Sequence, residues 1–270
     1  MAHTGADLLL VGVTFLGLAL LAAAYLAFQS WGFWALVPLF AVMCFVICTN
    51  YQCTAHNFVH NEFFAARWMN DAFSVLNTLA LGFSQTIFRE HHLNHHKHNN
   101  APLARDGSAG DLSYLRRYSG DEEEDEPFLS YILLSPLRAD ILSYARAAIR
   151  RKYKARLVAE AAALVLFWLF LLAVDWRFAL MFYLPLVYLG HVMTYAEGYF
   201  EHHKTTPGDR MRNAVSCYGS LYNWFWFNNG YHQEHHCYPA VHWTEIPEYR
   251  EKMLSEDERR VVSYAHWVNF

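Results

Sequence analysis

Four long apolar blocks constrain the fold of this chain more than any other feature of its sequence. They cover residues 8–28, 31–50, 157–174 and 178–195. Each is close to the roughly 20 apolar residues that a helix needs to cross a bilayer. No Lys or Arg precedes the first block, which favours a permanent anchor over a cleavable signal peptide. The blocks predict an all-α integral membrane protein with four transmembrane helices in two hairpins.

Basic residues between the second and third blocks indicate the orientation. From Arg138 to Arg156 the chain carries seven basic residues and one acid, so the positive-inside rule places this segment in the cytoplasm. With four spans, both termini and the two remaining segments, 56–156 and 196–270, are also expected to be cytoplasmic. These segments would form a cap, and the whole chain, 1–270, is expected to be a single membrane domain.

Three other segments have simpler interpretations. The stretches 72–88 and 214–231 are apolar but contain amide and hydroxyl side chains, which favours interfacial or re-entrant helices over further spans. A single extra crossing would also put the histidine groups described below on opposite sides of the membrane. The acidic run from Asp121 to Glu126 is expected to be a solvated loop.

Composition excludes several functions. The net charge of −4 makes nucleic acid an unlikely partner, and the five cysteines contain no CxxC pair. A fused rubredoxin, a zinc ribbon and a disulfide framework are therefore not expected.

Histidine is the unusual residue, because sixteen are present and most of them stand in four short groups. Three of these groups are HxxxH at His56 and His60, HxxHH at His92, His95 and His96, and HxxHH at His232, His235 and His236. An overlapping HxxxHH that begins at His91 is also present. Residues four apart share one face of a helix, so both imidazoles of such a pair can reach one metal ion. Asn57 stands where a zinc protease needs a glutamate, which excludes that class.

The number of histidines indicates two metal ions. One metal uses four or five protein ligands and keeps a position open, and neutral imidazole suits iron, copper and zinc. Activation of O2 requires redox chemistry that zinc lacks, so two Fe ions are favoured, with O2 as co-substrate.

These motifs, in this order and flanked by two apolar hairpins, resemble the membrane fatty-acid desaturase and hydroxylase superfamily, which includes alkane monooxygenases and carotenoid ketolases. The resemblance runs from His56 to about Pro247 and is marked in the stretch 228–236, which is followed by Pro239 and His242-Trp243. It implies four transmembrane helices under a cytosolic helical cap that holds a di-iron site.

The resemblance also implies a further ligand between the second and third boxes. Residues 197–203 are similar to the glutamate-histidine element of alkane monooxygenases, which makes His202 the expected ninth ligand. His203 follows where that element usually has tyrosine, so either histidine of this pair remains a candidate. His191, inside the fourth block, is a weaker candidate, and His3, His242 and His266 are expected to be non-ligands.

Several residues near the boxes have open roles. Carboxylates and amides that could orient the imidazoles are Glu62, Glu90, Glu201, Glu234, Asn228 and Asn229. Each could equally be a capping or solvated side chain. The aromatic run Tyr222, Trp224, Phe225, Trp226 and Phe227 could line an acyl tunnel or form an interfacial belt.

The resemblance implies O2-dependent oxidation of an unactivated C–H bond of a lipid substrate, and it makes fatty-acyl desaturation the most favoured reaction. Substrate placement, and not the ligand set, separates desaturation from hydroxylation. Hydroxylation of an alkyl chain and carotenoid ring oxidation are the alternatives. A metal transporter or haem electron carrier is disfavoured, because the spans contain few ionisable residues beyond Glu160 and His191.

Electrons must come from a separate ferredoxin, rubredoxin or cytochrome, because the chain shows no flavin, nicotinamide or haem signature. The basic residues available to receive such a carrier are Arg138, Arg146, Arg150, Arg151, Lys152, Lys154 and Arg156. Contact with anionic lipid head groups is the competing explanation for them.

Overall fold

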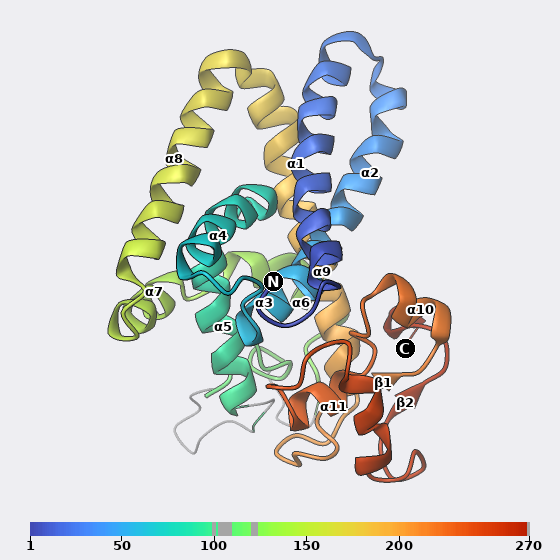
Figure 1. Ribbon diagram of the computed structural model, residues 1–270. Coiled ribbons are helices and arrows are strands. Elements are labelled where there is room, and N and C mark those ends of the chain that lie inside the picture. Colours follow the sequence, from blue (N-terminus) through green and yellow to red (C-terminus); the bar gives the residue numbers. More distant parts are fainter. Residues whose placement is uncertain (99–100, 102–109, 120–123, 269–270) are drawn as a thin grey trace. The chain divides into compact units, whose positions relative to one another are not determined.

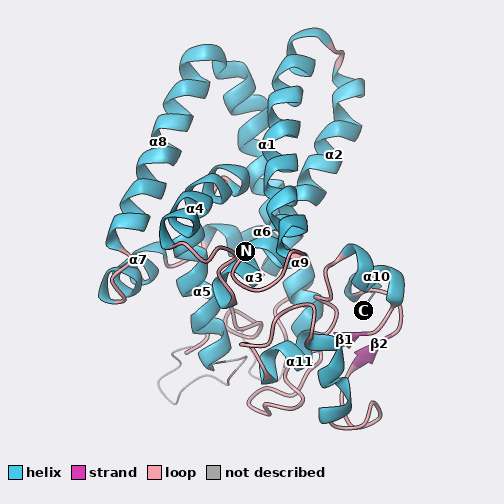
Figure 2. Cartoon of the chain, viewed as in Figure 1, coloured by secondary structure: helices cyan, strands magenta, loops and turns pink. Residues whose placement is uncertain are grey.

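The computed structural model describes residues 1–98, 101, 110–119 and 124–268, most of which are helical (Figures 1 and 2). The chain divides into two compact units. The first unit comprises Met1–Glu90 and Ile141–Thr194, and the second comprises His91–Asp140 and Tyr195–Phe270. Two of the three boundaries fall inside helices, α5 and α9, each of which begins in the first unit and ends in the second, and the third boundary directly precedes α7.

Helices make up the first unit. They are α1 (Asp7–Ser30), α2 (Phe33–Thr49), η1 (Asn50–Ala55), α3 (His56–His60), α4 (Arg67–Leu81), the start of α5 (Gln85–His98), α7 (Ile141–Arg150), α8 (Lys154–Arg177), η3 (Phe178–Tyr183) and most of α9 (Leu184–His202). Figure 1 shows α1 and α2 lying alongside each other, and their residues are in contact.

Three helical runs in the described residues are long and apolar enough to cross a membrane. They are Asp7–Ser30, Phe33–His60 and Lys154–His202, each of which contains an 18-residue stretch of high mean hydropathy (2.3, 2.0 and 2.5). Many of their large apolar side chains are exposed, including Leu9, Trp34 and Leu166. Apolar side chains on the outside of long helices are typical of a surface that faces lipid, so the chain is associated with a membrane.

The third run contains both of the last two predicted spans, and its helical path is interrupted at Asp175. This residue has the extended backbone angles φ −157° and ψ 95°. In a straight helix, Trp168 and Tyr183 would be about 22 Å apart at 1.5 Å per residue. Their ring centroids are only 5.1 Å apart, so the chain changes direction between them. The Asp175 carboxylate then accepts the backbone N–H groups of Arg177 and Phe178, at 2.9 and 3.2 Å, as a helix N-cap does.

The second run does not end at residue 50, where the predicted span ends. It continues through the π-helical segment η1 directly into α3, which carries the HxxxH motif. A π-helical turn rotates the residues that follow it about the helix axis, and such turns occur frequently at functional sites. His56 and His60 therefore stand on the extension of a long apolar helix and not on a separate one.

Close packing within the first unit depends on small and aromatic residues. Gly190 of α9 lies against Ile47 of α2, where an added Cβ would stand only 2.7 Å from a methyl group. A glycine at this contact allows the two helix backbones to approach closely. Phe178 stacks on Phe182 at 5.3 Å and meets Phe28 edge-on at 5.4 Å.

The stretches 72–88 and 214–231 are not continuous helices. The first is divided between α4 and α5 at Gly82, whose φ of 66° is left-handed. A Cβ at Gly82 would stand 2.6 Å from Val187, so both the angle and the space require glycine. The second contains only the short strand β1 (Ser216–Cys217) and α10 (Ser220–Phe225) as regular elements.

The second unit has shorter elements. Besides the ends of α5 and α9 it contains α6 (Phe128–Leu134), η2 (Ser135–Leu137), β1, α10, α11 (His232–Cys237), η4 (Ile246–Lys252), β2 (Val261–Val262) and η5 (His266–Val268). The strands β1 and β2, magenta in Figure 2, pair in parallel. This pairing ties the C-terminal segment to the residues that precede α11.

The prediction of a solvated acidic loop is wrong for the end of the run, while Asp121, Glu122 and Glu123 lie outside the described residues. Glu126 is buried and accepts hydrogen bonds from Arg138, at 2.9 Å, and from Ser130. Asp125 binds Arg116 at 3.1 Å. The charge run alone gave no sign of this burial, because the cationic partners are distant in sequence.

Glu160 of α8 has a buried carboxylate, and hydroxyl groups of the same unit donate hydrogen bonds to it. It accepts hydrogen bonds from Ser74, at 2.6 Å, from Ser84, and from both the hydroxyl and the backbone N–H of Thr86, at 2.7 and 3.0 Å. These contacts fix α4 and the start of α5 against α8. Glu160 is thus a structural residue of the apolar helix.

We expect Glu160→Ala to lower the free energy of unfolding by about 2–4 kcal/mol, because it leaves several buried donors without an acceptor. Thermal unfolding of the detergent-solubilised protein measures the effect. The matched control is Val158→Ala, at an exposed position of the same helix. Equal stability of the two variants would contradict the structural role of Glu160.

Candidate metal centre

Four predicted ligands meet within the second unit. These are His95 of α5, His202 of α9, and His232 and His236 of α11. The Nε2 atom of His202 lies 3.1 Å from those of both His95 and His232, and the Nε2 atoms of His232 and His236 are also 3.1 Å apart. Three helices thus bring four imidazole nitrogens to one point, within 4.8 Å of one another.

The hydrogen bonds of two of these rings fix where their protons are. His95 Nδ1 lies 2.8 Å from a carboxylate oxygen of Asp111, and His202 Nδ1 lies 2.8 Å from the carbonyl oxygen of Asn213. Both oxygens are acceptors, so each Nδ1 carries a hydrogen and each neutral ring has a lone pair on Nε2. The two Nε2 atoms cannot hydrogen-bond to each other. A cation between them would convert their repulsion into coordination.

The ring of His236 is also suited to bind a metal. Burial, followed by the nearby rings of His96 and His232, holds the pKa of His236 well below its usual range. A neutral imidazole is the form that coordinates a metal ion. His236 therefore offers a neutral nitrogen donor without competition from protons near pH 7.

A second group in the same unit comprises His92, His96 and His235. The Nε2 atom of His96 lies 2.9 Å from that of His92 and 3.0 Å from that of His235. His92 and His96 are four residues apart on α5, so the helix places both rings on one face. The two HxxHH motifs thus each contribute to both groups of nitrogens.

In the first unit, His56 and His60 lie one turn apart on α3, with ring centroids 5.5 Å from each other. His56 Nδ1 lies 3.0 Å from the carbonyl oxygen of Gln52, in the π-helical segment. The carbonyl can only accept, so the lone pair of a neutral His56 is again on Nε2.

The alternative ligands lie in other surroundings. His203 donates to Asp125 at 2.8 Å and stacks on Tyr199, whereas its neighbour His202 joins the group of four. His191 belongs to the first unit, where it packs against aromatic rings at 5.6 and 5.7 Å. His91 is half-buried, and the loss of solvent around its ring lowers its pKa to about 4; it belongs to neither group. The geometry favours His202 as the ninth ligand.

Few of the residues expected to orient the imidazoles do so. Glu201 is the exception, because its carboxylate lies 3.6 Å from His232 Nδ1 and accepts a hydrogen bond from Asn229 at 2.8 Å. The others bond elsewhere: Glu62 to Arg156, Glu90 to Arg89 and Arg151, Glu234 to Ser216, Tyr218 and Arg259, and Asn228 to the Trp243 carbonyl. Asp111, the partner of His95, was missed, because nothing in its sequence position connects it with that histidine.

A third group of possible ligands comprises Glu197, Glu201 and His266. His266 is fully buried, with Nε2 3.0 Å from the Val215 carbonyl and Nδ1 3.1 Å from the Tyr222 hydroxyl. Tyr222 in turn donates to Glu197. Of the other expected non-ligands, His242 lies 2.8 Å from the Thr244 hydroxyl.

The aromatic run does not form one continuous lining. Trp224 and Phe225 are exposed and contact each other at 4.6 Å, whereas Trp226 is buried. Phe227 has a left-handed φ of 49° and packs on Trp243. The exposed pair matches an interfacial belt better than the wall of a tunnel.

Comparison with known proteins agrees with the chemistry of these donors. The family model for fatty acid desaturases matches residues 29–267, nearly the whole chain. No individual curated protein matches the chain. Both HxxHH motifs, the HxxxH motif and the apolar runs Phe33–His60 and Lys154–His202 fall inside the matched range, whereas Asp7–Ser30 lies almost entirely before it. The chain therefore belongs to the fatty acid desaturase family.

Proposed function

We propose that this protein uses O2 and a di-iron site to desaturate a fatty-acyl chain. Membership of the family makes it an oxidoreductase of lipid C–H bonds. The observation that supports a metal site is the convergence of imidazole lone pairs, which matches metal coordination and not hydrogen bonding. Two separate groups of nitrogens support two metal ions.

The proposed ligand set is His56, His60, His92, His95, His96, His202, His232, His235 and His236. The group of four would hold one iron, and His92, His96 and His235 would contribute to the other. His56 and His60 are included in the set because they form the HxxxH motif. When bound, the irons would supply the oxidising power that removes hydrogen from a methylene group.

The protein itself positions the donors. Asp111 and the Asn213 carbonyl hold His95 and His202 with Nε2 turned toward the shared point, so the rings need no reorientation when metal binds. Whether the product is an alkene or an alcohol depends on how the acyl chain is placed, which makes alkyl hydroxylation and carotenoid ring oxidation the alternatives.

We further propose four membrane crossings with the histidine groups and both termini in the cytoplasm. The change of direction at Asp175 supports two crossings by the third helical run, since a run of 49 residues far exceeds one bilayer thickness. The basic segment after α7 supports the cytoplasmic orientation.

The reaction is tested by expressing the protein in a host and profiling its lipids. We expect new double bonds in acyl chains, lost in His95→Ala, because that variant removes one of the four converging nitrogens. His3→Ala is the control that should retain activity. New hydroxyl groups or ketolated pigments would select one of the alternative reactions, and an unchanged lipid profile would contradict the proposal.

The ninth ligand is tested by metal analysis of purified variants. Wild type should contain about two irons per chain, as expected from four or five ligands per metal. His202→Ala should lose iron, whereas His203→Ala should retain it, because His203 is held by Asp125. Loss of iron from His203→Ala alone, or stoichiometric zinc in active protein, would be inconsistent with this assignment.

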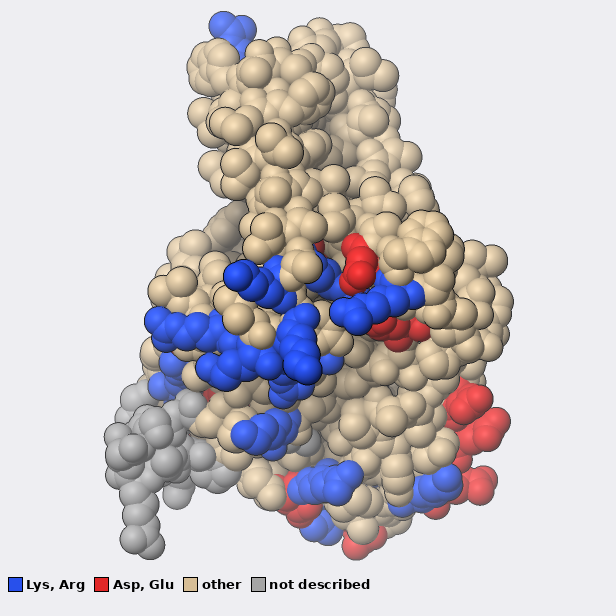
Figure 3. Space-filling view, turned by 60° about the vertical axis from the view of Figure 1, so that its left-hand side comes forward, with Lys and Arg blue, Asp and Glu red and all other residues tan. Residues whose placement is uncertain are grey.

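Electrons are proposed to come from a separate acidic carrier protein. On the face drawn in Figure 3, Lys and Arg side chains gather together. Two of the seven basic residues considered from sequence are unavailable, because Arg138 binds Glu126 and Arg156 is buried. The exposed ones are Arg146, Arg150, Arg151, Lys152 and Lys154.

Changing Arg146, Arg150 and Lys154 together to Glu should slow reduction of the protein by a reconstituted acidic carrier. The effect should diminish at high salt, because ions screen exposed charges. Stopped-flow spectroscopy of the iron-loaded protein measures the rate, and replacement of exposed acids of η4 by Gln provides the control. An unchanged rate would contradict a role in binding the carrier, and contact with anionic lipid head groups would remain as the explanation for these residues.

A further inference from the structure

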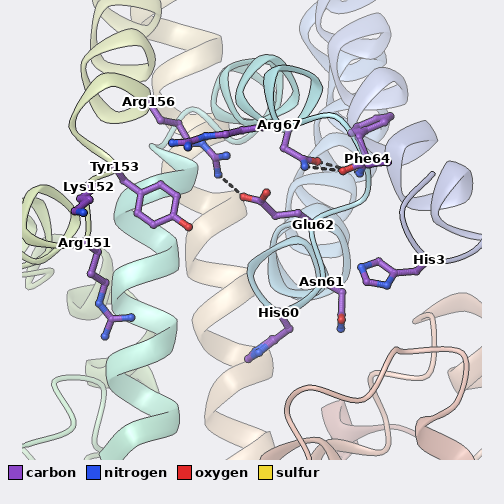
Figure 4. A pocket seen from close by; sticks show the side chains of 12 residues that line it. His3, His60, Asn61, Glu62, Phe64, Arg67, Arg151, Lys152, Tyr153 and Arg156 are labelled. Carbon is purple, nitrogen blue, oxygen red and sulfur yellow. Dashed lines mark hydrogen bonds and ion pairs between the residues drawn. The ribbon is translucent and has the colours of Figure 1, made fainter.

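A cavity of about 610 Å³ lies within the first unit, beside the residues that follow α3. Its wall includes Arg67, at the start of α4, and Arg151, Lys152, Tyr153 and Arg156, around the start of α8 (Figure 4). This volume is within the range of small-molecule sites. Cations gathered around a space of this size indicate an anionic ligand.

Part of this positive charge is already balanced. Arg156 binds Glu62 at 2.7 Å and Asp71 at 2.6 Å, and the first of these contacts is drawn in Figure 4. Arg151 lies 3.3 Å from Glu90. These ion pairs hold two arginines in place at the cavity, and their acids leave little attraction for a further anion.

Arg67 and Lys152 supply the uncompensated charge. Both are exposed, and neither forms an ion pair with any residue in the described part of the chain. Arg89, which lies over the Tyr153 ring at 4.4 Å, is a further cation next to the wall. The five cations thus exceed the acids Glu62, Asp71 and Glu90 by two charges.

Lys152 occupies an unusual backbone position. Its φ is 69°, and its N–H bonds to the Ile149 carbonyl while the N–H of Tyr153 bonds to the Ala148 carbonyl. This is the Schellman pattern that ends a helix, in which the left-handed residue is usually glycine. A lysine there costs conformational energy, which is typical of positions that serve a ligand.

We propose that this cavity binds the phosphate group of a phosphate ester. A phosphate monoester carries up to two negative charges, equal to the local excess, and accepts hydrogen bonds on several oxygens. Arg67 and Lys152 contact the phosphate, and the ion-paired Arg151 and Arg156 form a fixed part of the wall beside it. The remaining volume accommodates the polar group to which the phosphate is attached.

The phosphate can belong to a membrane lipid head group or to a soluble ester. Calorimetric titration of the full-length protein in detergent distinguishes these sources with two probes, dihexanoyl phosphatidic acid and glycerol 3-phosphate. Dihexanoylglycerol, which lacks the phosphate, is the reference. The measurement needs no turnover, so its failure is distinguishable from failure of the proposed reaction.

Two variants remove the uncompensated charges with little risk to folding. Arg67→Gln alters an exposed side chain, and Lys152→Gly places the residue that favours a left-handed angle. Each should weaken binding of a phosphate probe about tenfold, as expected for a charge-assisted hydrogen bond. Arg150→Gln and Lys154→Gln are matched controls, since they remove exposed basic residues that do not line the cavity.

Binding of either phosphate probe that is weakened by the cavity variants and not by the controls supports the site. Preference for phosphatidic acid then identifies a membrane lipid as the source, and equal binding of glycerol 3-phosphate identifies a soluble ester. The proposal is overturned if neither phosphate probe binds, if dihexanoylglycerol binds as well as phosphatidic acid, or if the controls weaken binding as much as the cavity variants.

Discussion

Repulsion between imidazole lone pairs is the constraint on which the metal centre depends. His95 and His202 each place Nδ1 against an oxygen, so in the neutral rings the lone pairs of the two Nε2 atoms face each other at 3.1 Å. Such a contact is unfavourable in the absence of a cation. The surrounding helices therefore hold an arrangement that coordination stabilises, and metal binding should contribute to the stability of the second unit.

The apolar helices impose a different constraint, because polar groups inside them need partners from the protein itself. Glu160 meets this requirement through the hydroxyl groups of Ser74, Ser84 and Thr86. Asp175 meets it at the interruption of the third run, where it accepts backbone N–H groups and a hydrogen bond from Gln29 at 2.6 Å. Both carboxylates thus stabilise the packing of the helices through hydrogen bonds, which is a structural role.

The basic residues around α7 and the start of α8 lie in two different surroundings. Arg146, Arg150 and Lys154 are exposed and do not line the cavity. Arg151 and Arg156, by contrast, line the cavity and form ion pairs with acids. The same basic segment of the sequence thus divides into exposed surface charge and charge held in ion pairs, which differ in how strongly salt screens them.

The sequence alone determined the apolar blocks and the helical spacing of the histidine motifs, since both follow from periodicity along the chain. It left His202 and His203 as alternatives. Adjacent residues on a helix point about 100° apart, so only the packing around α9 turns one of them to the histidine group and the other to Asp125. The tertiary structure also decided the role of Asp111 and the burial of Glu126, because both depend on partners distant in sequence, and distant contacts have no local pattern.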